Sequence, residues 1–259
     1  MLREYPRRLK RLSGPDLIVS VQKLSHRISE RFPDRGLTKD ATDFAGYAGA
    51  FVKEADSLSK RNLPVEIGIA ALALLGFGGT AFVLAQIPWI EIEFNQKQEF
   101  FQAMQGIDAA IHIAVSVALV IFFVANREAR RKRRIAFNGL IILRNFAYVI
   151  DSHQLDKDPA AFAAGLPATT SSPKRNLQPP ELLRYLDYCS EMLSCVSKFA
   201  ALYGQESRDR AVIEAVDDID MLTGMLSGKI WQKIAMLNDF MAHTHSGGYS
   251  KQAPIPVAA

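Results

Sequence analysis

The sequence predicts an all-α fold, a two-helix transmembrane hairpin with cytoplasmic helical hairpins on both sides. Two segments, residues 67–90 and 107–125, are almost purely apolar, whereas the rest of the chain is as charged as a soluble protein. Basic residues flank both segments, and the outer loop between them, residues 91–106, is acidic. Because basic flanks stay on the cytoplasmic side of a membrane, we expect both termini in the cytoplasm.

The overall composition is an average over two kinds of sequence. The chain has 259 residues, of which 49% are hydrophobic, and a formal charge of +4. This length suits one or two domains. No apolar run precedes position 60, so we expect no cleavable signal peptide and expect the first apolar segment to direct insertion.

Residues 1–62 predict a cytoplasmic helical hairpin. The cluster Ser-Gly-Pro-Asp at 13–16 is typical of a helix start. The sequence Pro-Asp-Arg-Gly at 33–36 is typical of a turn. We expect the second helix over 39–61, with Thr38 as its capping residue.

Residues 63–126 predict the transmembrane hairpin. The segment 67–90 carries no charge over 24 residues, and a helix of this length measures about 36 Å. A bilayer core is about 30 Å thick, so the segment can cross it. Trp89 lies at the far end, where aromatic residues mark the membrane interface. The segment 107–125 has 19 residues, enough to return.

A basic cluster follows the second apolar segment and begins a cytoplasmic helix over 127–158. So close to a span, basic side chains favour contact with anionic lipid head groups, and we expect no nucleic-acid binding. The cluster consists of Arg127, Arg130, Arg131, Lys132, Arg133 and Arg134.

The C-terminal third predicts a flexible linker, 159–180, and a second antiparallel helical hairpin, 181–242. The linker is rich in Ala, Pro, Ser and Thr, and a disordered tail is expected over 243–259. We expect the first helix to end at Gly204 and 181–242 to mediate homo-oligomerisation or binding of a protein partner. That helix carries a heptad seam, a coiled-coil pattern made of Leu182, Leu186, Cys189, Leu193, Val196, Ala200 and Tyr203.

A polar stripe runs along the second apolar segment. Asp108, His112 and Ser116 are spaced four residues apart and share one helix face. Ionisable residues in a membrane are costly and mark candidate functional sites, so a pore or proton path is one interpretation. The other is an Asp–His pair that satisfies itself near the interface, where Asp108 also suits the helix N-terminus.

Small residues predict how the two apolar helices pack. Small side chains let helix backbones approach closely in lipid. The expected packing positions are Gly76, Thr80, Ala110, Ala114 and Ala118.

The remaining polar clusters favour solvent over chemistry. Residues 151–158 hold three aspartates and His153, which could ligate a divalent metal, but their spacing fits no established motif and a solvated turn is favoured. Cys189 and Cys195 are expected to be free thiols in a reducing compartment. The sequence contains no Walker A, GxGxxG, GxSxG or HExxH motif. We therefore expect no enzyme activity, no cofactor and no metal.

Two stretches carry a resemblance to known proteins: FAYVIDSHQLDKDP at 146–159 and AVDDIDMLTGMLSGKIWQKIAML at 215–237. They resemble segments of uncharacterised bacterial membrane proteins with two spans and cytoplasmic helices. The architecture is also similar to that of SLATT proteins, which have two spans followed by a cytosolic helix. The SLATT resemblance implies a pore-forming effector.

These observations predict a multi-pass protein of the bacterial inner membrane. The expected role is a structural or signalling module that self-associates or binds a partner through its cytoplasmic helices. The alternative is a subunit of a small oligomeric channel or pore-forming effector, with the polar stripe lining the lumen. An oligomer is required, because two helices per chain cannot enclose an aqueous path.

Overall fold

The protein is helical throughout the part that the computed structural model describes, residues 11–85, 97–159, 162, 170 and 177–249. This confirms the all-α class. The chain divides into two compact units. We call residues 59–134 the apolar unit, and residues 1–58 together with 135–259 the helical unit.

The helical unit begins with α1 (Gly14–Arg31) and α2 (Gly36–Ser59). The Ser13 hydroxyl accepts a hydrogen bond from the Asp16 backbone N–H, which caps α1 as its sequence predicts. The second helix starts before position 39, so Thr38 is not its capping residue. Instead the Thr38 hydroxyl donates to the carbonyl of Phe32 and closes the turn.

The apolar unit contains α3 (Leu63–Ala85) and the first part of α4 (Lys97–Ser152). The second apolar segment and the basic cluster belong to one unbroken helix, so no new helix begins at 127. The predicted outer loop is shorter than 91–106, because α4 already includes residues 97–106. Trp89 and the end of the first predicted span lie outside the described residues.

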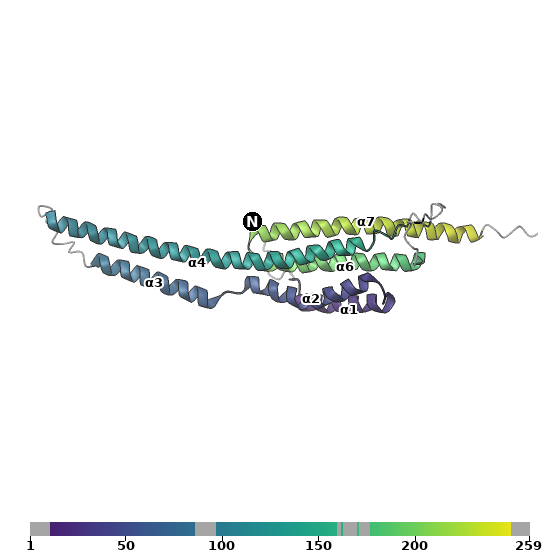
Figure 1. Ribbon diagram of the computed structural model, residues 1–259, viewed down its shortest axis with the longest axis horizontal. Helices are drawn as coiled ribbons and strands as arrows, with labels where there is room; N and C mark the ends of the chain where they lie inside the picture. The colour runs from purple at the N-terminus through teal and green to yellow at the C-terminus, as the bar shows by residue number, and fades with distance from the viewer. Residues whose placement is uncertain (1–10, 86–96, 160–161, 163–169, 171–176, 250–259) are drawn as a thin grey trace, which may run out of the picture. The chain divides into compact units, whose positions relative to one another are not determined.

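The contact between α3 and α4 is narrow. In Figure 1 the two helices run alongside each other within the apolar unit. Gly76 is the buried residue of α3, and a Cβ added there would lie 2.6 Å from Val117 Cγ1. Both helices contain a stretch apolar and long enough to cross a membrane, with mean hydropathy of 2.2 and 2.4, and only 6% of each stretch is buried. A soluble core helix would be mostly buried.

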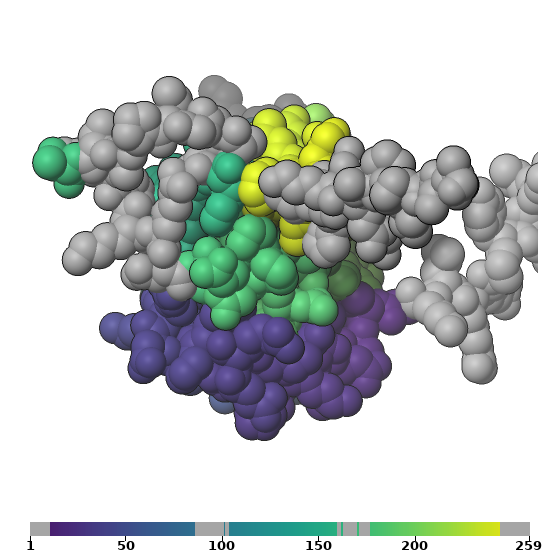
Figure 2. Space-filling view, turned by 90° about the vertical axis from the view of Figure 1, so that its right-hand side faces the viewer, coloured from purple at the N-terminus to yellow at the C-terminus, as the bar shows by residue number. Residues whose placement is uncertain are grey.

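The helical unit is completed by α4 from residue 135 onward, α6 (Pro179–Glu206) and α7 (Arg210–Tyr249). Figure 2 shows α6 between the α1–α2 layer and α7. All seven residues of the heptad seam are buried there. The seam therefore packs inside one chain, which leaves it closed to a second one.

Two helix ends differ from expectation. Gly204 does not end α6, which continues to Glu206 and closes with a Ser207 N–H bond to the Tyr203 carbonyl. Helix α7 continues to Tyr249, so residues 243–249 are helical where a disordered tail is predicted. At Gly204 a glycine costs only about 1 kcal/mol inside a helix, less than the packing of the buried Leu202 and Tyr203 provides. The expected tail beyond 249 and most of the linker 159–180 lie outside the described residues.

Aromatic rings join three helices in the core. The Phe44 ring of α2 lies 5.0 Å from Phe146 of α4 and 5.5 Å from Phe199 of α6, both edge-on. Such pairs contribute about 0.5–1.5 kcal/mol beyond their buried area. A polar contact supports the same junction, because the buried Tyr203 hydroxyl donates to Glu54 Oε2 at 2.9 Å.

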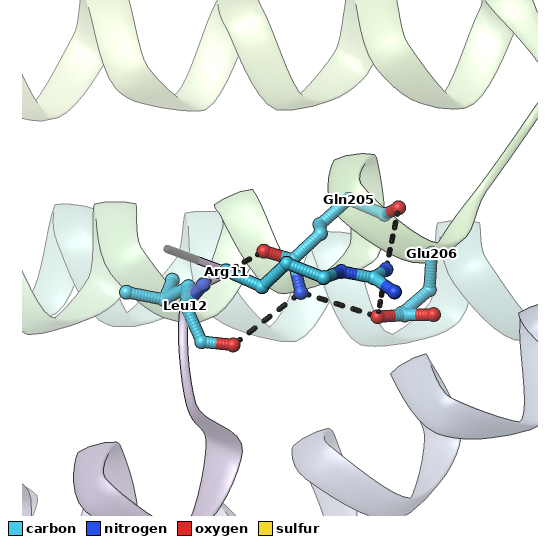
Figure 3. A network of polar contacts seen from close by, with 4 residues as sticks. All are labelled: Arg11, Leu12, Gln205 and Glu206. Carbon is cyan, nitrogen blue, oxygen red and sulfur yellow. Dashed lines mark hydrogen bonds and ion pairs between the residues drawn. The ribbon is translucent and has the colours of Figure 1, made fainter. Parts of the chain in front are cut away.

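The segment before α1 is tied to the end of α6. Figure 3 shows Leu12 and the Gln205 side chain exchanging two hydrogen bonds: the Leu12 N–H donates at 2.8 Å and its carbonyl accepts at 3.3 Å. Arg11 Nη2 lies 2.7 Å from Glu206 Oε1. These contacts join residues more than 190 positions apart and hold the segment before α1 against the end of α6.

Candidate functional site

A basic groove lies at the foot of the apolar unit, between the first turn of α3 and residues 123–134 of α4. Its volume is about 810 Å³. Its apolar end is formed by Val65, Phe123 and Val124. Its polar lining consists of Glu128 and the arginines Arg127, Arg130, Arg131 and Arg134.

Helix periodicity explains why these four arginines share the groove. Residues three and four apart lie on one helix face. Arg127 and Arg131 form one such pair, and Arg130 and Arg134 form another. Phe123 lies one turn before Arg127, so the apolar end continues the same face toward the second apolar segment.

The groove is strongly electropositive. All four arginine side chains are exposed, and none of them pairs with a carboxylate among the described residues. Glu128 is the acidic residue of the lining, and the Asn62 side-chain amide donates a hydrogen bond to it. Four guanidinium groups therefore face one carboxylate.

The other two members of the basic cluster are arranged differently. Lys132 Nζ donates a 2.7 Å hydrogen bond to the Lys60 backbone carbonyl, in the connection between α2 and α3. Arg133 does not line the groove. The cluster, which the sequence presents as one block of six, is therefore a group of four in a groove and two residues outside it.

An ion pair between Arg61 and Glu66 fixes the start of α3. Arg61 Nε donates to Glu66 Oε1 at 2.8 Å, and this hydrogen bond lowers the pKa of Glu66 below its usual value. The carboxylate is thus held by Arg61 and does not compensate the groove.

The polar stripe of α4 is exposed. His112 Nε2 lies 3.5 Å from Asp108 Oδ1, and both side chains as well as Ser116 are exposed. The structure therefore brings Asp108 and His112 together as a pair, with Ser116 one turn further along.

The packing face of α4 needs a correction. Ala110 is buried as expected, but Ala114 and Ala118 are exposed. The residues of α4 nearest the α3 glycines are Val117, beside Gly76, and Ile113, 4.0 Å from a Cβ added at Gly79. Branched side chains fill the space over glycine, so small residues are needed on one helix only. Thr80 is half-buried and donates to the Gly76 carbonyl at 2.8 Å.

The predicted turn at 151–158 is better ordered than a solvated loop. His153 pairs with Asp40 at the start of α2, and a Cβ at Gly36 would lie 2.6 Å from His153 Cε1. Within the described chain, no group of three or more His, Cys, Asp or Glu residues could hold a metal ion. Sequence reasoning missed this contact, because nothing near His153 indicates a partner 113 positions away.

Two lysines complete this end of the helical unit. Lys157 Nζ donates to the His153 carbonyl at 2.6 Å and lies 4.7 Å from the Tyr185 ring centroid. Lys233 Nζ donates to the Gln154 carbonyl at 2.8 Å. Burial lowers the pKa of both lysines. They bind carbonyls at the end of α4, where the helix dipole favours cations.

Both cysteines are free thiols, as expected. Burial raises the pKa of Cys189 to about 12, and it also raises the pKa of Cys195. The thiolate is the reactive form of cysteine. Both groups are therefore structural in their present surroundings.

The outer side of α7 exposes an apolar face, which we define as Met221, Gly224, Met225, Gly228 and Trp231. Their spacing places all five on the side opposite the buried residues of α7. The three large side chains are between 57% and 62% exposed. A Cβ added at either glycine would meet no described atom within 4 Å. Both glycines therefore belong to an open surface of α7.

Comparison with family models, curated proteins and solved structures found no match to this chain.

Proposed function

We propose that the protein is a structural or signalling module of the bacterial inner membrane. It crosses the membrane twice as a hairpin of α3 and α4, with both termini in the cytoplasm. The helical unit then self-associates in the cytoplasm. The observation that carries the proposal is the contrast between the exposed apolar surface of residues 63–85 and 104–125 and the closed core of the helical unit.

The exposed surface of the apolar unit supports the membrane. Leu74, Leu75 and Phe77 are each more than 70% exposed. Burying one such side chain contributes about 1.5–3 kcal/mol, so water is an unfavourable solvent for this surface. The hydrocarbon core of a bilayer can cover this apolar surface without contact to another protein.

The distribution of charge supports the orientation. The groove arginines follow the second apolar segment, and Arg61 precedes the first. Basic residues close to a span remain cytoplasmic. The same arginines then lie at the level of anionic lipid head groups.

Cysteine labelling tests this topology. Single cysteines replace Lys53, Lys97 or Lys229, and intact spheroplasts are treated with a membrane-impermeant maleimide. The two native thiols, which are mostly buried, serve as the background in the unmodified protein. We expect labelling at position 97 before lysis, and at positions 53 and 229 only after it. Labelling of position 53 or 229 in intact cells contradicts the topology.

The apolar face of α7 supports self-association through a second copy of this chain. The heptad seam is already buried, so contact must use another surface of residues 181–242. Two open glycines one turn apart let identical helices approach closely, and the methionines and Trp231 around them supply apolar contact area.

Native mass spectrometry in detergent tests this contact. We expect the unmodified protein as a dimer or higher oligomer, and the Met221→Lys/Met225→Lys variant as a monomer. The control, Val19→Lys/Leu155→Lys, places the same charges on exposed apolar positions elsewhere and should keep the oligomer. A strictly monomeric unmodified protein without a bound partner contradicts self-association. If a different protein is found bound, that protein and not a second copy covers the apolar face of α7.

A channel subunit is the second candidate function. One observation favours it: the Asp108–His112 pair and Ser116 are exposed on α4, away from its contact with α3. In an oligomer this stripe can line a lumen. Proteoliposome ion flux is the test, with Asp108→Asn and His112→Ala as variants. Absent flux, or flux that neither variant changes, excludes the stripe as a conduction path.

A further inference from the structure

We propose that the basic groove of the apolar unit binds an anionic phospholipid with two phosphates, of the cardiolipin class. This inference rests on the proposed membrane location and deepens it. A basic cluster beside a span attracts anionic lipid in general, whereas this groove selects one head group.

The arrangement of the four arginines in two pairs indicates a ligand with two phosphates. Arg127 and Arg131 form one pair at i and i+4, and Arg130 and Arg134 form the other. Arginine binds phosphate oxygens through two parallel N–H groups, so each pair suits one phosphodiester. A lipid with a single phosphate leaves the second pair without a counter-charge.

The apolar end of the groove indicates that the ligand is a lipid. Val65, Phe123 and Val124 form an apolar end that continues the arginine face toward the second apolar segment. Phe123 is 64% exposed, so it is available to an acyl chain. A soluble anion has no group that would use this end.

The neighbourhood of the groove keeps the arginines available. Glu66 is held by Arg61, and Glu128 accepts a hydrogen bond from Asn62. Glu66 is thus engaged outside the groove, and Glu128 is the one carboxylate of the lining beside four guanidinium groups. Basic pockets between transmembrane helices on the cytoplasmic side are sites where cardiolipin head groups bind.

The test uses the full chain in nanodiscs of zwitterionic lipid doped with either cardiolipin or phosphatidylglycerol. Cardiolipin enters at half the molar fraction, so that both discs carry the same charge. Native mass spectrometry after extraction then counts retained lipid. We expect about tenfold more cardiolipin than phosphatidylglycerol per protein, because a site with two bound phosphates releases lipid more slowly than a charged surface.

Charge-matched variants separate the groove from general attraction. Arg127→Gln/Arg131→Gln and Arg130→Gln/Arg134→Gln should each abolish the preference for cardiolipin. The control Arg133→Gln/Arg144→Gln removes the same charge from the same helix outside the groove, and should retain it. Equal loss in the control overturns the proposal, because the effect is then net charge alone.

Two further arms identify the source of the phosphate. Phe123→Ala should shorten cardiolipin retention, while Phe122→Ala, an exposed neighbour outside the lining, should not. Inorganic pyrophosphate should stabilise the protein against heat far less than cardiolipin does. Equal stabilisation by pyrophosphate overturns the lipid assignment. If labelling confirms the topology and cardiolipin is retained no better than phosphatidylglycerol, this inference fails alone.

Discussion

The two units of the protein are both built from helices, but the helical unit buries its apolar side chains and the apolar unit exposes them. In the helical unit Leu193 is fully buried, whereas in the apolar unit Leu75 is 74% exposed. Leu193 lies in α6, where apolar residues alternate with charged ones, whereas Leu75 lies in α3, which is apolar almost throughout. The difference lies in the polar faces: α6 has one and needs a core, while α3 has none and needs an apolar solvent.

The largest expected effect is on a buried ring. Phe199 is fully buried among Phe44 and Phe51, and Phe199→Ala should lower the free energy of unfolding by about 3–5 kcal/mol. Phe77→Ala, at a position 78% exposed, should change it by less than about 0.5 kcal/mol. Urea unfolding in detergent, followed by Trp231 fluorescence in a Trp89→Phe background, measures both. Equal effects would break the comparison between the units.

A glycine in the helical unit gives the next effect. A Cβ at Gly139 would lie 2.6 Å from Tyr203 Cζ, and the Tyr203 ring is fully buried. Gly139→Ala should therefore destabilise the protein by about 1–3 kcal/mol. Gly49→Ala is the control, because a Cβ there meets nothing within 4 Å, and it should stabilise α2 by about 0.5–1 kcal/mol. A neutral Gly139→Ala would show that α6 moves away without cost.

The matching glycine of the apolar unit sharpens the comparison. Gly76→Ala places a methyl group against Val117 and should cost about 1–2 kcal/mol. Val117→Ala in the same chain should restore most of the loss, since it removes the opposing methyl groups. Thermal unfolding in detergent measures the variants, with Gly78→Ala as an unobstructed control. Absence of rescue would place the strain elsewhere.

The smallest expected effect depends on pH. The folded pKa of Cys189 is about 12, above its ordinary value of 9.0, because burial disfavours the thiolate. The unfolded chain therefore loses a proton first, and stability present below pH 9 is lost as the pH rises. By about pH 10 the loss is about 1.4 kcal/mol. Urea unfolding near pH 7 and pH 10 should show a loss of stability that is larger by about this amount in the unmodified protein than in Cys189→Ala, where Cys195 and the two lysines still titrate.

The elements that the sequence predicts well are those with local signals. The heptad seam is buried at every predicted position, and Ser13 caps α1 as its residue type suggests. Helix ends were less predictable: packing of the buried Leu202 and Tyr203 carries α6 through Gly204, and α7 continues to Tyr249. Local capping residues do not report this packing.

The candidate site was predicted in outline. Six basic residues are visible in the sequence, but their division into four groove arginines and two outside depends on where α3 starts beside α4. The exposure of Ala114 and Ala118 also depends on how α4 packs against α3. It is set by Val117 filling the space over Gly76, and small-residue spacing on α4 does not indicate it.

The helical unit is discontinuous along the chain, and this has a consequence for biosynthesis. Its first two helices are separated from α6 by the whole apolar unit, and Arg27 reaches its partner Glu191 across 164 positions. At 5–20 residues per second, α1 and α2 wait on the order of ten to thirty seconds for α6 to leave the ribosome. During that interval Leu24, Ile28 and Phe44 lack most of their core. We therefore expect the yield of folded protein to depend on translation speed and on early chaperone contact at the N-terminus.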